Sequence, residues 1–122
     1  MSDRDDLGTP EGQEIENQAR EQTGQRQVQL RVTEQNMQTC YANAFRTNGT
    51  AEEVILDFGL NLVQPAQQGE PVQIMFNVKE RVILNYYSAK RLTLALGQAI
   101  RRHEEQFGEI ELDVAKRRRQ GT

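Results

Sequence analysis

The sequence predicts an α+β fold: an antiparallel sheet of about four strands, arranged as a meander, followed by one long C-terminal helix packed on the apolar face of the sheet. Apolar residues alternate with polar ones from Val72 to Leu84, which is the period of a strand. They then recur at helical spacing from Ala89 to Phe107. Since no turn residues separate the two patterns, we expect the last strand to run directly into the helix.

Four segments carry strand patterns, and their short connections indicate neighbouring antiparallel strands. Gln27–Thr33 alternates clearly, the segment from about Gln38 to Arg46 alternates weakly, and Glu53 begins a clear alternation that ends near Leu62. In the fourth segment, Val72–Leu84, we expect one apolar face and one solvated face. The apolar face holds Val72, Ile74, Phe76, Val78, Val82 and Leu84, and the solvated face holds Gln73, Asn77, Lys79 and Arg81. The residues from Pro65 to Pro71 must form a loop, because Pro71 lacks an amide hydrogen and Gly69 weakens strand pairing.

Local signals set the ends of the helix and of one turn. Asn85 stands where a helix needs an N-cap, so we expect the helix to begin at Tyr86. We expect it to end near Phe107, because Gly108 is suited to the position after a C-cap. The run from Thr47 to Thr50 contains Asn-Gly and predicts a turn, and the spacing of Thr50 from Glu53 matches a capping box that starts a single helical turn.

The two ends of the chain differ from the centre in composition. Residues 1–26 hold seven acids, three bases and few large apolar side chains, so we expect a flexible acidic arm. Residues 27–114 form the predicted single domain, and residues 115–122 form a basic tail that is frayed from Lys116 onward. Within the domain, residues 109–114 alternate and predict a short strand or an extended docking segment.

Charge is unevenly distributed over a chain whose formal net charge is −3. The negative net charge argues against a protein that binds nucleic acid through a generally basic surface, because binding to phosphates needs a concentration of Lys and Arg. The C-terminal part is nevertheless basic, and its cations are the candidate contacts for an anion or partner: Arg101, Arg102, Lys116, Arg117, Arg118 and Arg119. Binding of nucleic acid through this segment is the alternative function that the sequence leaves open.

Side chains suited to catalysis or metal binding do not form a recognisable set. Ser88 and His103 would lie about 22 Å apart on one helix at 1.5 Å per residue, so they cannot form a dyad within one chain. Cys40 and His103 could meet, but a lone cysteine and a histidine in an apolar stripe are more typical of a core. We therefore expect no enzymatic activity, no metal and no cofactor. A single cysteine and the lack of a leader or a long apolar run predict a cytoplasmic protein without a membrane segment.

The helix carries a leucine that its own sheet cannot cover. Leu94 lies about 140° around the helix axis from Ala89, away from the apolar stripe. In addition, one helix of about 33 Å cannot cover four strands. We therefore expect a homo-oligomer, most simply a dimer, and an oligomerisation or adaptor module that can also bind another protein. Its candidate self-association residues are Leu94, Tyr86 and Tyr87.

Four short motifs follow one another within residues 27–110: Tyr41-Ala42-Asn43, the run from Glu53 to Gly59, Ala89-Lys90-Arg91-Leu92, and Glu104-Glu105-Gln106-Phe107-Gly108. This ordered series resembles a family of small prokaryotic proteins, domain of unknown function 3467. The chain departs from the family at Asn85-Tyr86, where Ser-Pro is usual. The resemblance implies a small intracellular protein and implies no activity.

One of these motifs already suggests a local structure. Asp57 faces the solvated side of its strand, where it can pair with Lys79 or Arg81 of the adjacent strand. Gly59 permits a bulge or a close approach of the neighbouring backbone.

Overall fold

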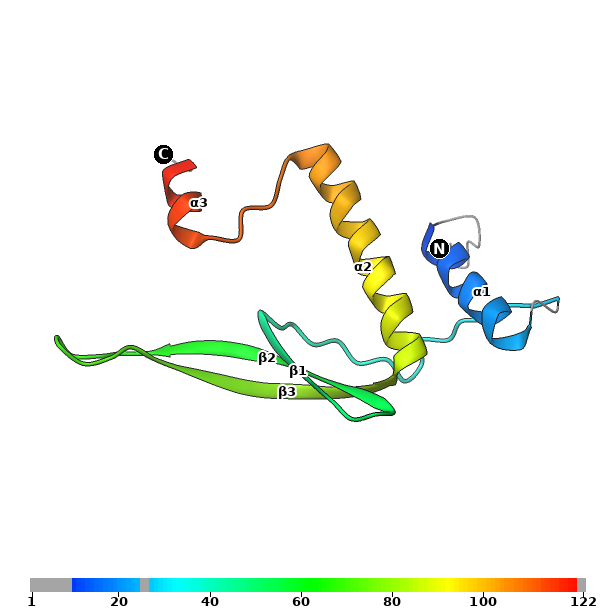
Figure 1. Cartoon of the computed structure of the whole chain (residues 1–122), viewed down its shortest axis with the longest axis horizontal. Coiled ribbons are helices and arrows are strands. Elements are labelled where there is room, and N and C mark those ends of the chain that lie inside the picture. The colour runs from blue at the N-terminus through cyan, green and yellow to red at the C-terminus, as the bar shows by residue number, and fades with distance from the viewer. Residues whose placement is uncertain (1–9, 25–26, 121–122) are drawn as a thin grey trace. The chain divides into compact units, whose positions relative to one another are not determined.

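The computed structural model describes residues 10–24 and 27–120, and it has an α+β fold (Figure 1). The elements are α1 (Pro10–Thr23), β1 (Ala44–Gly49), β2 (Glu53–Gln64), β3 (Gln73–Asn85), α2 (Tyr86–Phe107) and α3 (Val114–Gln120). The boundary between two compact units falls after Ala89, inside α2. The first unit contains the sheet and the second contains most of α2 together with α3.

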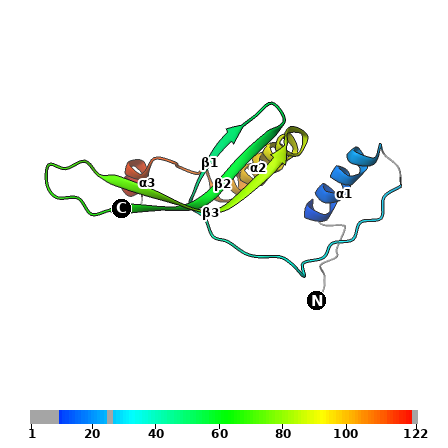
Figure 2. The same cartoon turned by 90° about the horizontal axis from the view of Figure 1, so that it is seen from below.

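The sheet has three antiparallel strands in the order β1-β2-β3, so the predicted meander is present with three strands in place of four (Figures 1 and 2). The missing strand is Gln27–Thr33, which forms no strand in the structure. The second predicted strand is shorter than expected and shifted along the chain, because β1 begins at Ala44 and not at Gln38, and it continues to Gly49 through residues predicted to form the turn. Alternation predicts which residues suit a strand, but a strand also needs a partner edge, which lies elsewhere in the sequence.

The turn between β1 and β2 is built around Thr50. Its amide donates to the carbonyl oxygen of Glu53 at 2.9 Å, and its Oγ1 accepts from the amides of Glu52 and Glu53 at 3.2 and 3.1 Å. The side-chain bond predicted by the capping-box spacing is therefore present, but it closes a hairpin turn and starts no helix. The hydroxyl of Tyr86 donates to the Thr50 carbonyl at 2.8 Å and ties this turn to the start of α2.

A bulge divides β3 into two halves. The even-numbered side chains of one half lie on one face of the sheet, and those of the other half lie on the opposite face. Phe58 of β2 pairs with Glu80, whereas the next residue, Gly59, pairs with Val78, so Lys79 is an extra residue in β3. A Cβ on Gly59 would overlap the carbonyl oxygen of Asn77, which explains why glycine stands here. The bulge corrects the expectation of a single apolar face on β3.

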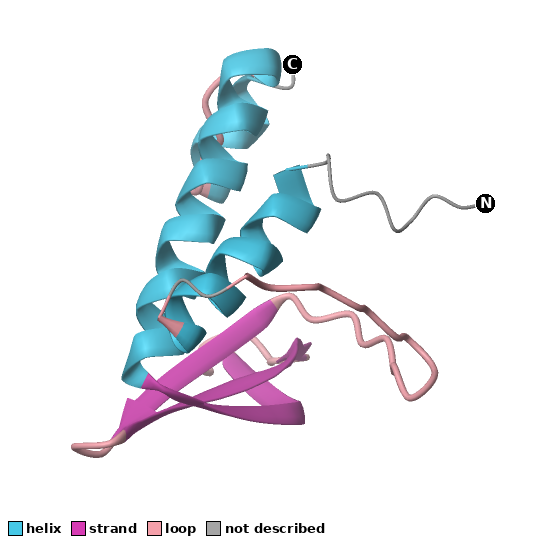
Figure 3. Ribbon diagram, turned by 90° about the vertical axis from the view of Figure 1, so that its right-hand side faces the viewer, coloured by secondary structure: helices cyan, strands magenta, loops and turns pink. Residues whose placement is uncertain are grey.

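The helix α2 has the bounds that the sequence predicts. It follows β3 with no loop, as Figure 3 shows. The amide of Ser88 donates to Asn85 Oδ1 at 2.7 Å, which confirms the N-cap. Gly108 has a φ of 95° and donates its amide to the Glu104 carbonyl at 2.8 Å, which confirms the stop. The predicted packing of this helix on the sheet stays a prediction.

Both ends of the chain contain helices that the sequence analysis did not expect. The helix α1 lies within the predicted flexible arm and has an ion pair between Arg20 and Glu16, at 3.4 Å. The helix α3 occupies the predicted frayed tail, and Asp113 Oδ1 accepts from the amide of Ala115 at its start. Alanine, glutamine, glutamate and arginine favour helix locally, which an argument from burial alone overlooks. The part of the arm before Pro10 lies outside the described residues, and residues 109–113 form no strand.

Candidate interaction surface

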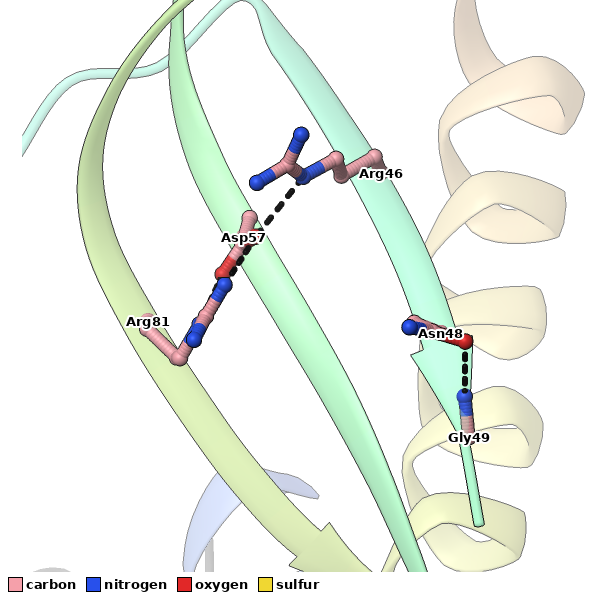
Figure 4. A network of polar contacts seen from close by, with 5 residues as sticks. All are labelled: Arg46, Asn48, Gly49, Asp57 and Arg81. Atoms are coloured by element: carbon pink, nitrogen blue, oxygen red, sulfur yellow. Dashed lines mark hydrogen bonds and ion pairs between the residues drawn. The ribbon is translucent and has the colours of Figure 1, made fainter.

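Three charged residues from three neighbouring strands meet at the centre of the sheet (Figure 4). Asp57 of β2 lies opposite Arg46 of β1 and opposite Arg81 of β3. Arg81 holds the carboxylate through two bonds, Nε to Oδ1 at 2.7 Å and Nη2 to Oδ2 at 3.0 Å. Arg46 adds a third bond from Nε to Oδ2 at 2.8 Å. The three side chains therefore link all strands of the sheet in one register.

The carboxylate of this cluster is buried, whereas the arginines remain open to solvent. Asp57 is 2% exposed, and the side chains of Arg46 and Arg81 are 60% and 55% exposed. The hydrogen bonds from Arg81 and then from Arg46 lower the pKa of Asp57 well below its ordinary value of 3.8, although burial alone would raise that pKa. Asp57 in turn raises the pKa of Arg81. Asp57 is thus ionised at neutral pH, and the cluster carries one net positive charge.

A contact of Arg46 with Phe76 shows which side chains of β3 lie on the same face of the sheet as the charge cluster. Its guanidinium carbon lies 5.8 Å from the ring centroid of Phe76, so Phe76 is on the same face as Asp57. This agrees with the register after the bulge, in which Phe76 pairs with Asn61. Without the bulge, Phe76 would share a face with Val82.

The pairing of Asp57 with Arg81 confirms one of the two predicted partners, and Arg46 is a partner that the sequence analysis missed. Lys79, the other predicted partner, is the extra residue of the bulge. A signal for Arg46 exists in the sequence, because counting outward from the Thr50–Glu53 turn places Arg46 opposite Asp57. That count depends on knowing that the two flanking strands pair with each other.

The first two family-like motifs come together beside the cluster. Asn43 donates its amide to the carbonyl of Gly59 at 3.0 Å, and its side-chain Oδ1 accepts from the amide of Asn61 at 2.9 Å. The Asn43 side chain thus takes the place of the next backbone partner and ends the pairing between β1 and β2. The Tyr41-Ala42-Asn43 motif and the Glu53–Gly59 motif therefore build one structural feature.

The sequence model of one protein family, described as protein of unknown function (DUF3467), matches residues 12–112. The chain belongs to the DUF3467 family. No curated protein and no solved structure matches the chain.

The sheet of this DUF3467 chain is apolar on both faces. The first, which we call the Leu56 face, holds Phe45, Val54, Leu56, Phe58, Leu60, Leu62, Met75, Val82 and Leu84. The second, the Phe76 face, surrounds the charge cluster with Ile55, Val63, Ile74, Phe76, Val78 and Ile83. Among the described residues no apolar side chain is buried. The two faces differ in degree, because five of the nine Leu56-face residues are half-buried, compared with two of the six Phe76-face residues.

The predicted self-association residues lie in different settings. Leu94 and Tyr87 are 61% and 78% exposed, which suits a contact with a partner. Tyr86 has a structural role, because its hydroxyl binds the Thr50 carbonyl.

The predicted anion contacts are divided between two helices. Arg101 and Arg102 are exposed on α2, and Lys116, Arg117 and Arg118 are exposed on α3. The side chain of Arg119 lies outside the described residues. The Lys116–Arg118 run is consecutive, so its side chains spread around the axis of α3 instead of sharing one side.

The structure also shows the surroundings of Cys40 and His103, the two residues considered as a catalytic pair. Cys40 is an exposed free thiol and not the core residue that we expected. His103 contacts the ring of Phe107, with ring centroids 4.8 Å apart. Over residues 10–24 and 27–120, no group of three metal-ligating side chains gathers in one place. Within the same ranges, none of the helices has the length and apolar content needed to cross a membrane.

Proposed function

We propose that this DUF3467 chain is a non-enzymatic self-association module, and that a second copy covers the Phe76 face of its sheet. The observation that carries the proposal is the two-sided apolar sheet. A single helix can cover only one face of a sheet, so the other face needs a further layer. The Leu56 face holds more apolar residues and is the less exposed of the two, so we assign the second copy to the Phe76 face.

The size of the sheet supports a dimer interface. With 12 residues, β2 is about 40 Å long at roughly 3.3 Å per residue. Two strands of this length and the six-residue β1, spaced about 4.8 Å apart, then offer about 500 Å² on each face. A standard interface buries about 800 Å² per partner, so the Phe76 face supplies more than half of it.

The charge cluster suits the centre of such an interface. Arginine is enriched at protein interfaces because its planar group packs on apolar surfaces and still donates hydrogen bonds. Arg46 contacts Asp57 through Nε alone, which leaves its two Nη groups outside that contact. These groups can donate to acceptors on the second copy.

The test is the molar mass of the full chain, measured by light scattering over a concentration series. We expect the mass of two chains for the native sequence and of one chain for Ile83→Asp, since Ile83 lies on the Phe76 face and is 53% exposed. Losing one isoleucine from each copy removes about 3 to 6 kcal/mol of burial, so association weakens by more than about 100-fold.

Two control variants make this result specific. Gln68→Asp adds the same charge in the exposed loop between β2 and β3, and we expect it to leave the dimer intact. Val82→Asp places the charge on the Leu56 face, next to Ile83, and we expect reduced thermal stability instead of a clean monomer. A native chain that stays monomeric at high concentration, or a dimer that survives Ile83→Asp, refutes the proposal.

Nucleic-acid binding through the basic C-terminal segment is the second candidate function. It is favoured by the exposed cations of α2 and α3, which concentrate positive charge at one end of an acidic chain. Binding to a DNA or RNA oligonucleotide should then weaken steeply with salt and disappear when residues 116–122 are deleted. An absence of binding at low salt removes this candidate.

A further inference from the structure

The outer half of the β2–β3 hairpin extends beyond the end of β1. The pairing of β1 with β2 stops at Gly59, whereas β2 and β3 continue to pair from Leu60–Gln64 with Gln73–Asn77. Figure 1 shows this two-stranded part reaching past β1. This ribbon has no third strand beside it among the described residues. Two strands alone are only marginally stable in water, so a further strand would stabilise the ribbon.

The ribbon has the properties of an edge that accepts another strand. Its exposed apolar residues lie on both faces and are Leu62, Val63, Ile74 and Met75, each between 46% and 69% exposed. Gln73–Val78 contains no charged residue and no proline, which are the features that natural edge strands use to prevent pairing. The bulge and the charges of β3 follow this stretch, from Lys79 onward.

The β3 side of the ribbon offers the longer open edge to a new strand. On the β2 side, the Asn43 side chain already binds the amide of Asn61 and occupies the first position beyond β1. On the other side, β3 is the last strand of the sheet, and no strand of the described ranges pairs with its outer edge. A strand that joins the ribbon therefore pairs with β3 over Gln73–Val78.

The chain itself contains a segment that fits this edge. Gln27–Thr33 alternates apolar and polar residues as a strand does, yet it forms no strand in the structure. Seven residues span about 23 Å, and the six residues of Gln73–Val78 span about 20 Å, so the lengths match. Arg31 is the only charge in the segment, and it meets no like charge on Gln73–Val78.

We infer that Gln27–Thr33 of one copy pairs as a strand with the free edge of β3 in a second copy, over Gln73–Val78. The exchange is reciprocal, so each copy gives one strand and receives one, and each sheet gains the fourth strand that the sequence predicts. This inference rests on the proposed self-association and adds the segment and the edge through which it acts.

The test is amide hydrogen exchange of the full chain at two concentrations, one on each side of the dimer transition. In the dimer we expect the amides of both segments to exchange at least about tenfold more slowly than in the monomer. The double variant Gln29→Pro/Leu30→Pro removes two neighbouring amides, one of which must face β3 in either register. We expect it to abolish the added protection of Gln73–Val78, while Gln29→Ala/Leu30→Ala retains it. The proline variant keeps its own sheet, because residues 29 and 30 form no strand within the chain.

A cysteine cross-link adds a direct readout of the pairing. With Cys40 replaced by serine, copies carrying one cysteine at each position from 27 to 33 in turn are mixed with copies of different mass that carry Met75→Cys. A disulfide between the two masses at one of these positions is expected, since only opposed Cβ atoms come close enough to bond.

The outcomes separate this inference from the proposed function. A dimer in which the proline variant still protects Gln73–Val78, or in which no mixed disulfide forms, refutes strand exchange and leaves self-association standing. Protection that does not change with concentration shows pairing within one chain and also refutes the exchange. A native chain without any dimer refutes both.

Discussion

Replacing Gly59 with alanine tests whether the bulge organises the sheet. A Cβ at this position would overlap the carbonyl oxygen of Asn77 and crowd the Cα of Val78. Both are backbone atoms of β3 and cannot move aside as a flexible side chain can. Inserting a methyl group into a packed site costs about 1 to 3 kcal/mol, and we expect Gly59→Ala to lie at the upper end of this range.

The measurement is thermal unfolding followed by circular dichroism, at one protein concentration for all variants. A loss of 1 kcal/mol lowers the midpoint by about 4 to 8 °C in a domain of this size, so we expect a decrease of more than about 10 °C. Gly97→Ala is the matched control. Gly97 lies in α2, where an added methyl group would meet no heavy atom within 4 Å, and alanine is favoured over glycine in a helix by about 1 kcal/mol. The two variants should therefore shift the midpoint in opposite directions.

A result of equal midpoints for the native chain and Gly59→Ala would show that β3 does not approach β2 this closely. The bulge, and with it the division of β3 between the two faces, would then be wrong. Ile83 pairs with Ile55, on the side of the bulge nearer to α2, so its position on the same face as Asp57 does not depend on the bulge. The Ile83→Asp experiment would therefore remain interpretable.

Two further predictions concern side chains that hold the sheet. The lowered pKa of Asp57 means that its ionised form stabilises the fold at every pH above about 4, and that this contribution is lost as the pH falls below 3.8 toward the folded-state pKa. The stability difference between the native chain and Asp57→Asn should thus be constant from about pH 5 to 7 and shrink below pH 3.8, and an unchanged difference at about pH 2 would contradict the ion pairs. Tyr86→Phe removes the hydrogen bond to Thr50 and should cost about 1 kcal/mol in chemical unfolding, whereas Tyr87→Phe, at a side chain that is 78% exposed, should cost nothing measurable.

The helix α2 shows what could be predicted from the sequence. Its first and last residues depend on Asn85 and Gly108, which act on backbone groups three or four residues away. The loop from Pro65 to Pro71 and the strands on either side of it follow from equally local properties. Such interactions lie within a few residues of the chain, so the residue types and their spacing contain them completely.

The charge cluster and the two faces of the sheet depended on contacts far apart in the chain. Arg46 and Arg81 meet Asp57 from 11 and 24 residues away, and only the pairing of three strands brings them together. Likewise, one extra residue at Lys79 turns the side chains of half of β3 to the other face of the sheet, although the apolar residues keep to even-numbered positions on both sides of Glu80. The number of strands also depends on contacts that are distant in the chain. Gln27–Thr33 has the pattern of a strand, but it forms one only if it pairs with the edge of another strand, and its own sequence does not show whether such an edge is available.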